Sequence, residues 1–183
     1  MAQEQKPGGG LKGALNKAGD MVGGMVGKAS AASAGSHDSE AFVKNACVSD
    51  LYEVEAGRLA MERARSDAVR ELGMMMVDHH TTATHQMQAA LMSSEVTRFL
   101  PDLKPTTQLD DRRNGLLKHL VEAPAQDFDK AYLDQQRTAH QEAITLHRGY
   151  AENGDNPQLR SVAIGGLPMI ERHLKAIERI GVH

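Results

Sequence analysis

The chain has 183 residues, of which 40% are hydrophobic and 25% are charged, a composition that suits one globular domain with its own core. With three Phe, three Tyr and no Trp, the core has to be built from aliphatic residues and methionine, which favours packed helices. The formal net charge of -3 argues against a nucleic-acid partner, and the single cysteine, Cys47, excludes an intrachain disulfide or a cysteine-built zinc site.

Residues 1–37 differ in composition from the rest, with PGGG at 7–10 and KASAASAGS at 28–36. We predict a flexible Gly/Ala/Ser-rich tail. Leu11, Leu15 and Val22 recur at helical spacing, which leaves open a helix that docks on a membrane surface or a partner, although several glycines disfavour it. No apolar run is long enough for a signal peptide or a membrane span, so we expect a cytoplasmic protein without a transmembrane segment.

Residues 38–183 form the predicted domain, which begins with two long helices. Asp38 or Ser39 can cap a first helix that extends to about residue 65, and Ser66 opens a second that extends to about residue 94. Because the connection is so short, these helices should pack antiparallel. Pro101 and Pro105 then indicate an irregular crossing, which leads to a short helix near residues 109–122.

Two further long helices follow the crossing. The third should extend from about residue 127 to residue 153, where Gly154 is a natural stop. Asn156 and Pro157 open the fourth, since proline in the first turn loses no helical hydrogen bond. The expected fold is all-α: a ferritin-like four-helix bundle with a long crossover that carries a short extra helix.

Helical phase, at about 100° per residue, shows which polar side chains fall within the apolar stripe of each long helix. Glu53 falls inside the stripe of the first helix, and His140 and His173 fall inside those of the third and fourth. On the second helix, His79 and His80 lie on opposite flanks of the stripe. Each long helix therefore directs at least one titratable side chain inward.

A carboxylate and several imidazoles on facing helices can hold Zn, Mn or Fe. Otherwise the histidines are neutral, hydrogen-bonded core residues. A di-iron centre normally has a Glu-x-x-His pair on each of two helices, whereas Met76, Arg137 and Ile170 stand three residues before His79, His140 and His173. This pattern favours a mononuclear site or no metal at all.

Other candidate residues are expected to lie outside the site. Asp78 and His85 point away from the stripe of the second helix, and His119 belongs to the short connecting helix. We expect His85 and His119 to be dispensable for stability. Met76 and Met87 fit the apolar stripe, which favours a role as core residues over Cu(I) ligation.

Four stretches of the chain resemble the bacterial ferritin-like family named domain of unknown function 4142, over about residues 40–180. They are YEVEAGRLA (52–60), MMVDHH (75–80), FDKAYLDQQRTAHQ (128–141) and NPQLRSVAIGGLPMIERHL (156–174). The resemblance implies a four-helix bundle but no settled activity. The residues that match its recurrent polar positions are Glu53, Asp78, His79, Gln136, His140 and His173.

The resemblance selects His79 over His80, so the predicted metal ligands are Glu53, His79, His140 and His173. The chain departs from the family in two respects: Ala83 stands where an Asn is expected, and members are commonly exported. We predict a metal-binding bundle, with zinc as one candidate ion and a stress-related role. The alternative is a non-catalytic structural or interaction module, with a protein partner or a second copy of the chain.

Overall fold

Helices make up the regular structure of residues 37–181, which are the residues that the structure, a computed structural model, describes. The predicted all-α class is confirmed for this part of the chain, which contains no strand. Its helices are α2 (Ser39–Arg63), α3 (Asp67–Leu91), α4 (Ser94–Thr97), α5 (Asp111–Glu122), α6 (Phe128–Asn153) and α7 (Pro157–Ile180). The predicted tail lies outside the described residues, except for its last residue, His37.

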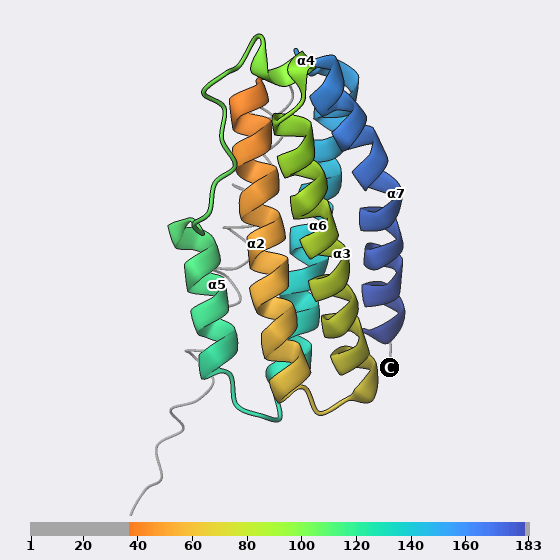
Figure 1. The fold of residues 1–183 in the computed structure, drawn as a ribbon. Coiled ribbons are helices and arrows are strands. Elements are labelled where there is room, and N and C mark those ends of the chain that lie inside the picture. Colours follow the sequence, from red (N-terminus) through yellow and green to blue (C-terminus); the bar gives the residue numbers. More distant parts are fainter. Residues whose placement is uncertain (1–36, 182–183) are drawn as a thin grey trace, which may run out of the picture.

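The four long helices lie side by side, and each packs against two of the others (Figure 1). α2 and α7 both pack against α3 and α6. After α4 the chain returns along the outside of the molecule to α5, which packs on α2 and α6. α5 is the short helix that the sequence predicted near residues 109–122.

Local sequence signals explain where several helices begin. The Asp38 carboxylate accepts a hydrogen bond from the backbone N–H of Ala41 at 2.7 Å and thereby caps α2. The Asn156 side chain accepts one from Leu159 at 3.1 Å and caps α7. The second long helix ends at Leu91, earlier than predicted, and the chain turns there into the separate helix α4.

Arginine side chains hold α5 in place. The Arg112 guanidinium donates two hydrogen bonds to the buried Glu142 carboxylate of α6, at 2.8 and 3.0 Å, a geometry that fixes both position and orientation. At the other end of α5, Arg63 of α2 donates to the backbone carbonyls of Leu120, Val121 and Ala123. α5 is therefore tied to both helices that it covers.

Two glycines allow α2 and α3 to approach closely. A Cβ atom on Gly57 would lie 2.7 Å from the carbonyl oxygen of Gly73, and a Cβ on Gly73 would lie 2.8 Å from the carbonyl oxygen of Gly57. Both contacts are shorter than carbon and oxygen atoms tolerate, and both involve backbone, which has little freedom to move. Any larger residue at either position would push the two helices apart.

The hydrophobic core consists of two clusters with polar side chains between them. On α3, Met76 belongs to one cluster and Met87 to the other, and His80 lies between them. Both methionines are buried, as predicted. His140 of α6 and His173 of α7 occupy the corresponding positions on their helices. A polar layer therefore crosses the core at one height.

Alanine substitutions at the glycines test the importance of the close approach. Gly57→Ala or Gly73→Ala should lower the free energy of unfolding by about 1–3 kcal/mol, as overpacking does. Gly115→Ala is the matched control, because nothing lies within 4 Å of its Cβ position in α5; it should stabilise the helix by about 0.5–1 kcal/mol. Urea unfolding measures all three changes, and equal effects at the three sites would contradict the packing argument.

Candidate metal centre

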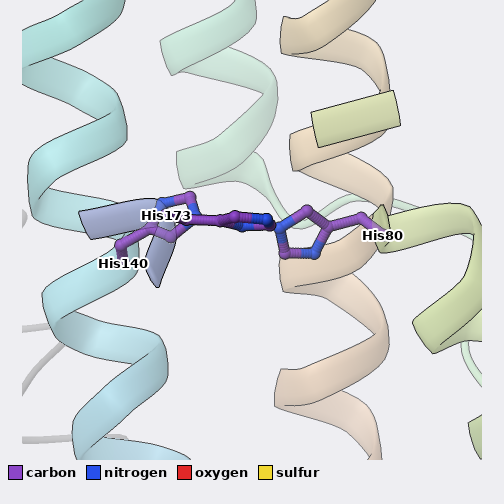
Figure 2. A group of neighbouring side chains, drawn as sticks. All are labelled: His80, His140 and His173. Atoms are coloured by element: carbon purple, nitrogen blue, oxygen red, sulfur yellow. The ribbon is translucent and has the colours of Figure 1, made fainter. Parts of the chain in front are cut away.

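Three buried histidines from three helices meet in the polar layer: His80 of α3, His140 of α6 and His173 of α7. One ring nitrogen from each lies within 4.8 Å of the other two, and the side chains are only 1–3% exposed. Figure 2 shows the three rings turned toward one another. Imidazole nitrogens gathered in this way are suited to bind a metal ion.

Asp50 of α2 orients the first of these rings. Its Oδ1 lies 2.8 Å from His80 Nδ1, so Nδ1 carries the hydrogen and donates it to the carboxylate. His80 Nε2 is buried and has no hydrogen-bond partner among the described residues. A carboxylate behind an imidazole is the arrangement that fixes metal-binding histidines in other proteins.

The other two rings belong to a chain of hydrogen bonds. His140 Nδ1 lies 2.9 Å from the backbone carbonyl oxygen of Gln136, and His140 Nε2 lies 3.2 Å from His173 Nδ1. His173 Nε2 in turn lies 2.7 Å from Nδ1 of the half-buried His79. If His140 Nδ1 donates its hydrogen to the Gln136 carbonyl and His173 Nε2 donates its hydrogen to His79, then no hydrogen lies between His140 Nε2 and His173 Nδ1, and both nitrogens have free lone pairs.

Burial sets the charge of these groups. It lowers the pKa of His140 well below its usual value, and it lowers that of His173 to about 3, with neighbouring histidines contributing in the same direction. Burial also acts to lower the pKa of His80, but the hydrogen bond and charge of Asp50 outweigh it, so that this pKa is raised. His140 and His173 are therefore neutral at pH 7, as metal ligands must be.

Glu53, a predicted ligand, is buried but stands on the other side of His140. Its Oε1 lies 3.8 Å from His140 Nδ1, the nitrogen that faces away from His173. Burial raises the pKa of Glu53 to about 7, although His80 and Gln136 lower it somewhat. Glu53 is not part of the three-histidine group.

The structure thus brings together two of the four predicted ligands, His140 and His173, with His80 in place of His79. His79 is half-buried and contacts the group from outside, through its hydrogen bond to His173. Sequence reasoning missed Asp50, although it lies one helical turn before Glu53 and therefore shares its face of α2.

Histidines expected to be outside the site differ from one another. His85 is exposed, as predicted, and so is Asp78. His119 is half-buried, and its Nδ1 lies 3.0 Å from Nε2 of the buried Gln135. The connecting helix α5 packs on the core, and His119 therefore takes part in a contact between α5 and α6. The position of His119 in the sequence did not reveal this contact.

The profile of the family described as "Domain of unknown function (DUF4142)" matches residues 24–180. The chain belongs to this family. Searches of curated proteins and of solved structures found no match. The family description assigns no activity, so a functional assignment has to come from the site itself.

No helix between residues 37 and 181 combines the length and the apolar character that crossing a bilayer requires. This agrees with the prediction made from the sequence for these residues.

Acid should destabilise the metal-free protein. Below its ordinary pKa of 6.5, His173 binds a proton in the unfolded chain but not in the folded protein until about pH 3. The unfolding free energy should therefore fall by roughly 1.4 kcal/mol per pH unit for each such histidine. Glu53 acts in the opposite sense between about pH 4.5 and 7 and offsets part of this loss.

The variant His173→Gln removes one of the groups that bind a proton when the protein unfolds in acid. Urea unfolding in the presence of a chelator, at pH 7, 6 and 5, should show a shallower decline for the variant than for the parent. Identical slopes would contradict the depressed pKa of His173.

Proposed function

We propose that this protein binds one divalent metal ion through His80 Nε2, His140 Nε2 and His173 Nδ1, inside a ferritin-like four-helix bundle. The observation that carries the proposal is the group of three buried imidazoles, one of which has a nitrogen without a hydrogen-bond partner. A buried polar nitrogen of this kind is costly unless something binds to it.

The donor set favours particular ions. Imidazole nitrogens suit zinc, iron, copper and nickel, whereas manganese prefers oxygen ligands. Zinc is our first choice, because three neutral histidines with a fourth position left for a small molecule form one of its common sites. Iron is the second choice, and manganese becomes the least favoured of the three ions considered from the sequence.

The surrounding groups suit a bound ion. Asp50 and the Gln136 carbonyl accept hydrogen bonds from His80 and His140 and so direct the opposite nitrogens inward. His79 does the same for His173, by accepting from its Nε2. On this proposal His79, first predicted as a ligand, is a positioning residue for His173.

A non-catalytic structural or interaction module is the second candidate. It is favoured by the hydrogen bonds that link His79 to His173 and His173 to His140, which satisfy these rings without a metal. In this case the histidines would only connect α3, α6 and α7. Metal content distinguishes the two candidates.

Elemental analysis of the untagged, full-length protein should find about one metal ion per chain. A chelator should lower the melting temperature, because an ion bound only to the folded state stabilises it. His80→Gln should abolish both effects, whereas His85→Gln, on the exposed face of the same helix, should preserve them. A metal-free protein whose melting temperature is insensitive to added zinc would favour the structural module.

Asp50→Asn tests the group behind His80. The amide keeps the size of the carboxylate but loses its charge, so zinc affinity should fall by about 10- to 100-fold. Asp78→Asn, on the exposed side of α3, is the control and should leave affinity unchanged. Competition with a chromophoric chelator measures both, and equal affinities for the two variants would show that Asp50 does not tune the site.

A further inference from the structure

Beside the three histidines, the polar layer contains side-chain atoms whose hydrogen bonds are not satisfied within the described chain. They are Oε2 of Glu53, the hydroxyl of Tyr132, and both Oε1 and Nε2 of Gln136. The three side chains are at most 1% exposed. Folded proteins rarely leave buried polar atoms unpaired, and so many close together point to a bound molecule.

The three side chains share one region of the core. Tyr132, Gln136 and His140 follow one another at four-residue intervals on α6 and so lie on one face of that helix. Glu53 reaches this face from α2, which packs on α6, and its Oε1 lies 3.8 Å from His140 Nδ1.

The pKa effects among Glu53, Gln136 and Tyr132 agree with their lying close together. Burial raises the pKa of Tyr132 well above its usual value, and the charge of Glu53 raises it further. The Gln136 side chain lies close enough to Glu53 to lower its pKa as a hydrogen-bond donor does, against the larger effect of burial, although no atom of the Gln136 amide has a partner at hydrogen-bond distance and angle.

The chemistry of these atoms selects the occupant. Glu53 offers an acceptor, while the Gln136 amide and the Tyr132 hydroxyl each offer both a donor and an acceptor. The amide and hydroxyl hydrogens would repel a bare cation, and the Glu53 carboxylate would repel an anion. Neither kind of ion therefore suits this set of groups. Water both donates and accepts, and a buried water typically makes about three hydrogen bonds, the number of side chains here.

We propose that Glu53, Gln136 and Tyr132 form a closed binding site for water in the core, next to the three-histidine group. The site goes beyond the proposed metal centre and does not depend on it, because its atoms are separate from the three nitrogens that would bind the ion. It forms one side of the polar layer, and the half-buried His79 lies on the other side of the histidines.

Two near-isosteric variants of the full-length, metal-free chain test this site: Tyr132→Phe and Gln136→Met. If water pairs with these side chains, each variant loses hydrogen bonds, and its unfolding equilibrium constant should rise about fivefold or more. If the atoms are truly unpaired, replacing them by apolar atoms should leave stability unchanged or improve it.

Tyr52→Phe is the matched control. The Tyr52 hydroxyl is also fully buried, but it donates to Gln135 Oε1 at 2.8 Å, so its removal gives the loss expected for one satisfied buried tyrosine. If the proposal holds, Tyr132→Phe should raise the unfolding equilibrium constant by about as much as Tyr52→Phe does.

Nuclear magnetic resonance provides the direct readout. Cross-peaks between slowly exchanging water and the Gln136 side-chain amide should be present in the parent and in Tyr52→Phe, and absent from Gln136→Met. Absence of these cross-peaks from the parent would overturn the proposal even if the variants are less stable, since the loss would then come from packing or from the direct contact between Gln136 and Glu53. Variants as stable as the parent would overturn it as well.

Discussion

The rest of this structure depends on the burial of ionisable groups at one height of the core, because that burial costs free energy that the surrounding packing has to offset. Glu53 of α2 and one histidine from each of α3, α6 and α7 are removed from water there. Burial opposes charge, so the carboxyl pKa rises and the pKa values of His140 and His173 fall. Two hydrophobic clusters, one on either side of this layer, supply the favourable burial that offsets its cost.

Helix packing and site geometry depend on each other. Gly57 and Gly73 let the backbones of α2 and α3 come into contact, and the same pair of helices carries the hydrogen bond between Asp50 and His80. That bond turns His80 Nε2 toward the other histidines. A wider spacing between α2 and α3 would weaken the bond and with it the orientation of the ring, so two residues without side chains contribute to the chemistry of the site.

The metal centre and the water site proposed above use different atoms of one polar layer. Three histidine nitrogens face one another, whereas Glu53 and Gln136 lie beyond the opposite nitrogen of His140. His140 therefore stands between the two sites, with one ring nitrogen toward each. A ligand in either site would remove part of the cost of burying the layer, because it would pair atoms that the described chain leaves unsatisfied.

The sequence by itself determined the all-α class and the approximate bounds of the long helices, and it showed that Glu53, His140 and His173 lie on inward faces. These features follow from helix caps and apolar spacing, which are local properties of the chain. Only the tertiary structure decided which of these residues meet. Helical phase fixes the face on which a residue lies but not its height relative to other helices. His79 and His80 flank the stripe on opposite sides, and the packing of α3 between α2 and α7 buries His80 against Asp50 and leaves His79 at the edge, beside His173.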